Sequence, residues 1–177
     1  MIYFYFYIIS FSIIGYGFFV SKFLDINKNN FGLLGLIGIV FLCFFSYFSS
    51  LFVKHNYFLN SLFIIIGLLI FIFSLRKITS LKREFIYFFI VFILLILFIS
   101  ISKNHDDFPY YHFPYMILLT EHSHPIGLGL LNNGFRSPSS IFFIGSMFYL
   151  PGINFYLFHV TPALIMGFSN LLLLNLT

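Results

Sequence analysis

The residues best suited to chemistry lie in one short stretch, KNHDDFPYYHFPY, at residues 103–115. It holds two adjacent carboxylates, Asp106 and Asp107, in a chain of which only 8% of residues are charged. A carboxylate at a boundary between lipid and water can act as a general base that takes the proton of an attacking hydroxyl. Asp107, and after it Asp106, are therefore the candidate catalytic residues.

Two other interpretations of this pair stay open. Asp107 comes two residues before Pro109, and an aspartate ahead of a proline in the first turn is typical of a helix N-cap, with Asp106 merely solvated. Alternatively, Asp106, Asp107 and His112 could hold a divalent metal, although their spacing matches no diagnostic ligand pattern. No other cofactor is expected.

Arg136 is a third candidate, in the stretch NNGFRSPSS. A guanidinium is planar and can donate two parallel hydrogen bonds to a phosphate, so a lone arginine among glycine and serine residues suits an anionic ligand. The alternative is that Arg136 extends to the lipid headgroups only to keep its charge in water.

The elements that position these residues are membrane helices. Apolar residues make up 60% of the chain and the mean hydropathy is +1.03, whereas soluble domains carry about a quarter charged residues. Apolar runs of about 20 residues can satisfy their backbone in lipid only as helices. Four such runs come first, at residues 2–24, 31–53, 57–75 and 85–102. The sequence therefore predicts an all-α, polytopic transmembrane bundle of five or six spans.

Positive charge orients the chain in this prediction. Of the nine Lys and Arg residues, six flank the loops after the first and third runs: Lys22, Lys28, Arg76, Lys77, Lys82 and Arg83. Positively charged loops stay in the cytoplasm, so residues 103–140 are expected to be extracytoplasmic. The expected location is a bacterial inner membrane, with the lipid bilayer as the main partner. The charges form no basic stripe, and we expect no nucleic-acid partner.

The second half of the chain is expected to complete a single transmembrane domain, residues 1–177. In the outward loop, DFPYYHFPYMILLTEH predicts an aromatic helix along the membrane surface. Residues 139–160 fit one span kinked at Pro151-Gly152. Alternatively, residues 139–150 are too short to span and lie at the interface, and residues 158–176 form the fifth span. The abrupt apolar end suggests that residues 1–177 are the front part of a longer protein.

The stretches DDFPYYHFPY and GLGLLNNGFRSPSSIFF together resemble the first large external loop of the C-superfamily of membrane glycosyltransferases. The resemblance covers roughly residues 103–170. It implies an enzyme of the cell envelope that transfers a sugar from a polyprenyl-phosphate donor to a glycan or lipid acceptor. It also implies that Asp107 is the base, that Arg136 stabilises the leaving phosphate, and that Tyr111 and His112 bind substrate.

Two other functions compete with this one. A non-catalytic membrane subunit would need only packing faces, which the sequence offers in abundance. A transporter would need ionisable residues inside its spans. The interiors of the four predicted spans contain no Lys, Arg, His, Asp or Glu, only Cys43, and Lys22 lies at the end of the first run.

Overall fold

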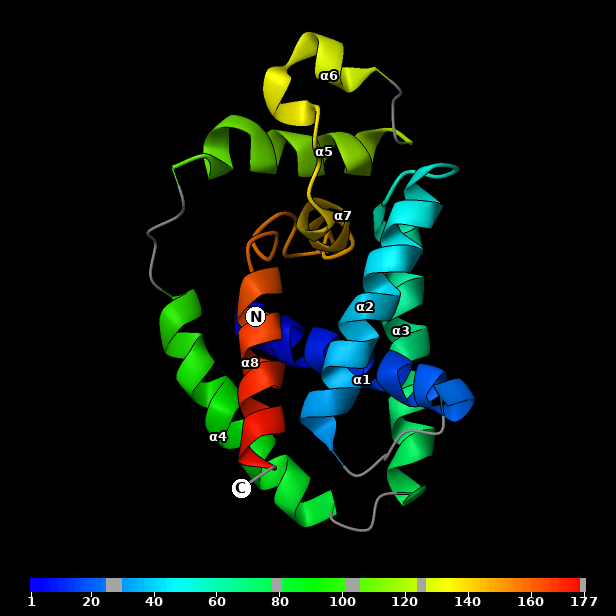
Figure 1. Cartoon of the computed structure of the whole chain (residues 1–177), viewed down its shortest axis with the longest axis vertical. Helices are drawn as coiled ribbons and strands as arrows, with labels where there is room; N and C mark the ends of the chain where they lie inside the picture. Colours follow the sequence, from blue (N-terminus) through cyan, green and yellow to red (C-terminus); the bar gives the residue numbers. More distant parts are fainter. Residues whose placement is uncertain (25–29, 78–80, 101–105, 124–126, 176–177) are drawn as a thin grey trace. The chain divides into compact units, whose positions relative to one another are not determined.

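The computed structural model describes residues 1–24, 30–77, 81–100, 106–123 and 127–175. Its α-helices, in chain order, are α1 (Ile2–Leu24), α2 (Phe31–Ser50), α3 (Tyr57–Ser74), α4 (Leu81–Ile99), α5 (Phe113–Glu121), α6 (Leu128–Leu131), α7 (Ser140–Ser146) and α8 (Thr161–Leu174) (Figure 1). Short 3-10 turns occur at Leu75–Lys77 and Asn133–Phe135, and a π-helical turn at Phe108–His112. Within these described ranges there is no strand, so the predicted all-α fold is confirmed.

Three helices, α1, α2 and α3, are long and apolar enough to cross a membrane. They mark the chain as a membrane protein, and their bounds agree closely with the first three predicted runs. The fourth run differs at its start, because α4 begins at Leu81 and takes Lys82, Arg83 and Glu84 into its first turn. A helix can begin with charged residues where its first turn reaches water, while the apolar run that follows stays in lipid.

Residues 139–160 do not form one kinked helix, which was one of the two arrangements that the sequence left open. Helix α7 ends at Ser146 and the chain then turns until Val160, with a β-bridge between Leu150 and Asn154. Gly152 and Asn154 adopt positive φ angles of 81° and 46°, a conformation that ends regular helix. Helix α8 follows with 14 residues, or about 21 Å at 1.5 Å per residue.

The chain divides into two compact units. Unit 1 consists of Met1–Leu42, Phe63–Ile101 and Pro162–Thr177, and unit 2 consists of Cys43–Leu62 and Ser102–Thr161. The predicted site residues all belong to unit 2.

Unit 1 is built on glycine contacts between helices. A methyl group added to Gly15 of α1 would collide with the backbone of Gly67 in α3, and one added to Gly17 would collide with the carbonyl of Leu34 in α2. Small residues let helix backbones approach closely, which is how helices associate in lipid, where the hydrophobic effect is absent. Phenylalanine rings also pack between helices of this unit: Phe88 of α4 stacks on Phe11 of α1, with centroids 4.8 Å apart, and on Phe92 of its own helix at 4.2 Å.

A buried carboxylate in unit 1 was not predicted. Glu84, in the first turn of α4, is fully buried and accepts a 2.8 Å hydrogen bond from the backbone N–H of Phe31, the first residue of α2. Its Oε2 also accepts from the side-chain amide of Asn175 at 3.3 Å. A carboxylate satisfies the exposed N–H groups of a helix start and is favoured by the helix dipole. Glu84 thus ties the starts of α4 and α2 to the end of α8.

Unit 2 has its own core, formed where α5 packs against α7 (Figure 1). The buried residues of this core are Tyr115, Met116, Leu119, Phe142, Phe143 and Phe158. The contact is close at Gly145 of α7, where an added methyl group would collide with the sulfur of Met116 and lie 2.9 Å from the carbonyl oxygen of Phe158.

Candidate functional site

The aspartate pair lies at the start of the predicted aromatic helix. Asp106 and Asp107 are both exposed, in a turn that leads into the π-helical turn and then α5. Asp107 occupies the N-cap position and Pro109 follows in the first turn, as predicted, but the Asp107 side chain makes no capping hydrogen bond. Its φ and ψ of −75° and −13° are helical, whereas a capping residue normally has extended backbone. The structure therefore does not support capping as the role of Asp107.

The π-helical turn packs against the loop that carries Arg136. A methyl group added to Gly134 would lie 3.1 Å from both Cβ and Cγ of Tyr111. This loop is shaped by Asn132, whose side-chain oxygen accepts a 2.9 Å hydrogen bond from the backbone N–H of Gly134. Two segments more than 20 positions apart in the sequence are thereby joined, and the candidate Tyr111 lies beside the turn that precedes the candidate Arg136.

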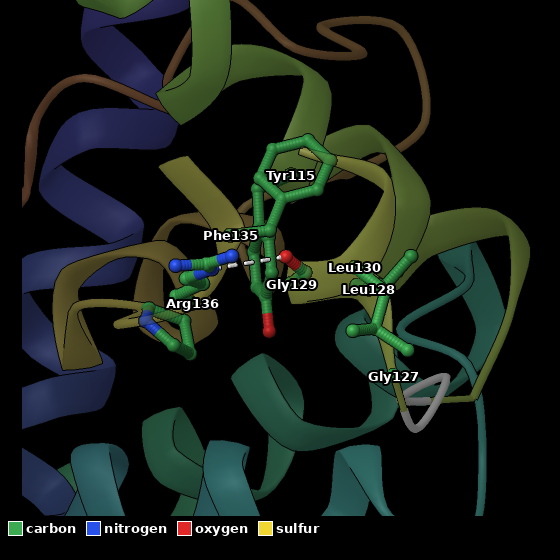
Figure 2. A pocket seen from close by; sticks show the side chains of 8 residues that line it. Tyr115, Gly127, Leu128, Gly129, Leu130, Phe135 and Arg136 are labelled. Carbon is green, nitrogen blue, oxygen red and sulfur yellow. Dashed lines mark hydrogen bonds between the residues drawn. The ribbon is translucent and has the colours of Figure 1, made fainter. Parts of the chain in front are cut away.

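Arg136 lines an open pocket of about 420 Å³. Its Nε donates a 3.3 Å hydrogen bond to the carbonyl oxygen of Gly129, as Figure 2 shows. The side chain also packs on Gly129, where an added methyl group would lie 2.9 Å from Cγ of Arg136. The pocket is otherwise mostly apolar, and its complete lining is Tyr115, Gly127, Leu128, Gly129, Leu130, Phe135, Arg136 and Pro138.

The hydrogen bond to Gly129 orients the guanidinium. It uses Nε, and in the described part of the chain no carboxylate pairs with the two terminal NH₂ groups. A guanidinium held by one backbone contact, with its terminal donors available, can bind an anion at low conformational cost.

Tyr115 is the buried aromatic residue in the lining of this pocket. The residue is 1% exposed, and its ring lies 5.3 Å from that of Phe135 and 5.6 Å from that of Phe142, between centroids. Burial, with a smaller contribution from nearby Tyr47, raises the pKa of Tyr115 to about 12. The hydroxyl therefore stays neutral at physiological pH and can act in the pocket only as a hydrogen-bonding group.

His112 packs as an aromatic residue. Its ring centroid lies 4.3 Å from that of Tyr111 and 4.7 Å from that of Phe142. Among the described residues, no group of three or more His, Cys, Asp or Glu side chains is arranged to hold a metal ion. The proposed set of Asp106, Asp107 and His112 therefore gains no support from the geometry.

A buried polar cluster positions α5 and α7, and it centres on His55, which the sequence analysis missed. The backbone N–H of this fully buried residue donates a 2.8 Å hydrogen bond to Leu119 of α5. Its Nδ1 lies 2.7 Å from Oγ of Ser146 in α7, and its Nε2 lies 3.0 Å from Oγ of Ser49 in α2. Asn60 adds hydrogen bonds from its amide to the carbonyls of His55, Ser146 and Tyr149.

The protonation of this cluster follows from its geometry. Burial lowers the pKa of His55 to about 4, so one ring nitrogen donates and the other accepts. Ser146 donates to the carbonyl of Phe143 at 2.8 Å and can accept from Nδ1–H. Ser49 then donates to Nε2 in preference to the carbonyl of Ser46, which is farther away at 3.2 Å. We assign His55 as the neutral Nδ1–H tautomer.

The predicted site residues are only partly brought together. Arg136 lies in the pocket, and Tyr111 contacts the turn next to it. The ring of His112 packs instead on Phe142 of the unit 2 core. Asp106 and Asp107 do not line the pocket. Tyr115 and Gly129 complete the arrangement, and neither was predicted as a site residue. Tyr115 follows Tyr111 by four residues, so helical spacing is a signal in the sequence that could have found it. Nothing in the sequence indicates that the carbonyl of Gly129 orients Arg136.

Comparison with known proteins gives one match. No curated protein and no solved structure matches the chain. A family model described as a domain of unknown function, DUF8201, matches residues 1–177. The chain therefore belongs to the DUF8201 family.

Proposed function

We propose that this protein is a membrane glycosyltransferase, or the N-terminal part of one, that binds a polyprenyl-phosphate sugar at the Arg136 pocket. It would transfer the sugar to a glycan or lipid acceptor on the outer face of a bacterial inner membrane. The proposal includes five or six spans, of which α4 and α8 would supply two beyond the three long helices.

The observation that carries the proposal is the placement of Arg136. One oriented guanidinium lies in a pocket whose remaining lining is apolar and aromatic, with Leu128, Leu130 and Phe135 around it. A phosphate joined to a hydrocarbon chain needs both features, a planar cation for the charge and apolar surface for the chain. The pocket volume of about 420 Å³ lies within the usual range of about 300–1,000 Å³ for small-molecule sites.

Two residues, Asp107 and Arg136, would share the mechanism. Asp107 would accept the proton of the acceptor hydroxyl as that oxygen attacks the anomeric carbon of the donor sugar. The bond from this carbon to the phosphate oxygen would break, and Arg136 would stabilise the charge that develops on the leaving phosphate. Because Asp107 does not line the pocket, the acceptor would have to lie between the two residues.

Binding of polyprenyl phosphate tests the proposal directly. The protein would be reconstituted in phosphatidylcholine vesicles and titrated with polyprenyl phosphate. In Arg136→Lys, affinity should fall about tenfold or more, because an ammonium cannot donate two parallel bonds from one plane. Lys54→Ala, which removes an exposed cation of the same unit, is the matched control and should bind as the wild type does.

The same titration tests the alternative that Arg136 only contacts lipid headgroups. If Arg136 only extends to headgroups, Arg136→Lys should bind polyprenyl phosphate as well as the wild type, and phosphatidylglycerol should compete equally in both. That outcome would remove Arg136 from the donor site.

A further inference from the structure

An apolar groove on unit 1 contains one polar side chain. The groove lies between α4 and α8, has a volume of about 420 Å³, and is lined by Val91, Leu94, Leu95, Met166, Asn170, Leu173 and Leu174. Most of the apolar residues in it are also exposed at the surface, including Leu94 at 54% and Leu173 at 61%. Among the lining residues, Asn170 alone has a polar side chain.

The side-chain amide of Asn170 makes no hydrogen bond with any residue in the described part of the chain. Asn170 differs in this from Asn30 and Asn175, which lie at helix ends of unit 1. Asn30 accepts from the backbone N–H of Leu33 at 3.0 Å, and Asn175 donates to Glu84 at 3.3 Å.

Asn170 lies deeper than those residues. The hydrogen bond from Asn175 places the end of α8 beside Glu84, which follows the exposed Lys82 and Arg83 in the first turn of α4. These two charged side chains mark the water boundary. Asn170 precedes Asn175 by five residues, which is about 8 Å along a helix that rises 1.5 Å per residue. With α8 as a membrane span, Asn170 lies inside this boundary, where it lines the groove.

An amide in hydrocarbon needs a polar partner. Lipid chains can cover leucine and valine but cannot hydrogen-bond, so an unpaired amide there is costly. Side chains such as asparagine instead bond across helices and hold them together in the membrane. Met166, Asn170 and Leu173 follow the spacing of one helical face, so the groove runs along α8 and presents Asn170 to a helix that packs beside it.

We propose that this groove is a dimer interface in which α8 of a second copy of the chain docks, with Asn170 bonded to Asn170 of that copy. A carboxamide carries both donors and an acceptor, so two of them related by a two-fold axis satisfy each other. A two-fold interface uses the same surface on both copies, and a single self-complementary residue in an apolar groove meets that requirement. The proposal does not depend on the glycosyltransferase function.

Energy transfer between labelled copies tests this interface. Chains of residues 1–177 carrying donor or acceptor fluorescent proteins at the N-terminus would be reconstituted together in phosphatidylcholine liposomes at a series of protein-to-lipid ratios. The wild type should associate, and Asn170→Leu should weaken association about 5- to 30-fold, as expected for loss of an interhelical hydrogen bond. Asn170→Gln, which keeps the amide, should retain most of it.

A lipid-facing position supplies the matched control. Leu69 of α3 is 48% exposed and lies five residues before the end of its helix at Ser74, a placement like that of Asn170. In a Cys43→Ala background, Leu173→Cys, which lines the same groove and leaves the Asn170 amide in place, should form an oxidised dimer and Leu69→Cys should not.

Three outcomes would overturn the proposal. Energy transfer of the wild type no higher than random co-localisation is the first, and it is also the result expected if the groove receives a helix of a different protein. Undiminished association of a normally folded Asn170→Leu is the second. The third is cross-linking at Leu69→Cys but not at Leu173→Cys.

Discussion

Tyr111 and Gly134 are in van der Waals contact, and this contact joins the aromatic helix to the arginine loop. A methyl group on Gly134 would be 3.1 Å from Cβ and Cγ of Tyr111, closer than carbon atoms normally approach. The contact holds the turn that directly precedes Arg136 against the turn that directly follows Asp107.

Gly134→Ala should therefore destabilise the protein by about 1 to 3 kcal/mol, the usual cost of overpacking. The Tyr111 Cβ is attached directly to a helical backbone and cannot turn away as the tip of a long side chain would. Thermal unfolding in detergent would measure the loss. Asn133→Ala is the control, since this neighbouring residue is exposed and should change stability little. Equal stability of the two variants would show that the contact is loose.

Burial of His55 predicts a dependence of stability on pH. The pKa of His55 falls to about 4 in the folded protein, while an unfolded histidine titrates near 6.5. Between these values the unfolded state binds more protons, so the unfolding free energy should decrease as the pH drops from 6.5 to 4, by about 3 kcal/mol at most. Above pH 6.5 this contribution is fully present.

Denaturant unfolding at pH 4 to 8 would measure this decrease, with His55→Gln as the test variant. Glutamine keeps hydrogen-bonding groups but does not titrate, so this part of the pH dependence should disappear. Asn60→Ala should lower stability at every pH and keep the slope, because it removes hydrogen bonds from the same cluster without removing the titrating group. A slope that survives in His55→Gln would assign the dependence to another residue.

Hydrophobic runs predicted the long helices because membrane helices are defined by local composition. The first run, residues 2–24, coincides with α1. The polar contacts were not predictable in the same way. Glu84 looked like part of a loop, yet it is buried because the start of α2 and the end of α8 both reach it in space.

In the candidate site, too, the helix start was predictable from the sequence and the polar contacts were not. The position of the helix start after Asp107 was predictable from Pro109, but the absence of a capping bond was not, because it depends on the helical backbone of Asp107 itself. His55 appeared only as a residue that ends a run. Its importance comes from Ser146, 91 positions away, and such a pairing leaves no local pattern in the sequence.

The charge asymmetry predicts that Ser137 faces the outside and Lys82 the cytoplasm. Both residues are exposed, so single cysteines there, in a Cys43→Ala background, are accessible to reagents. In intact cells an impermeant thiol reagent should label Ser137→Cys and leave Lys82→Cys unlabelled until the membrane is opened. The reverse pattern would place the Arg136 pocket in the cytoplasm and exclude a donor on the outer face.

The aspartate pair can be tested by single substitutions that keep shape and remove the proton acceptor. If Asp107 is the general base, Asp107→Asn should lower sugar transfer from a polyprenyl-phosphate donor about 10²- to 10⁴-fold. Thermal unfolding of the variant would be measured beside transfer, so that a loss of folding is separated from a loss of catalysis. Asp106→Asn is the matched control, since it lies next to Asp107, is equally exposed, and should be affected far less.

Binding and transfer must be separated in this experiment, because a misplaced donor would also lower transfer. Asp107→Asn should bind polyprenyl phosphate with wild-type affinity, since the residue does not line the Arg136 pocket, while its transfer rate falls. Lost binding would instead make Asp107 a residue of the donor site. If the Asp106→Asn, Asp107→Asn double variant transfers sugar at the wild-type rate, neither carboxylate is the base, and the proton of the acceptor must be taken by another group.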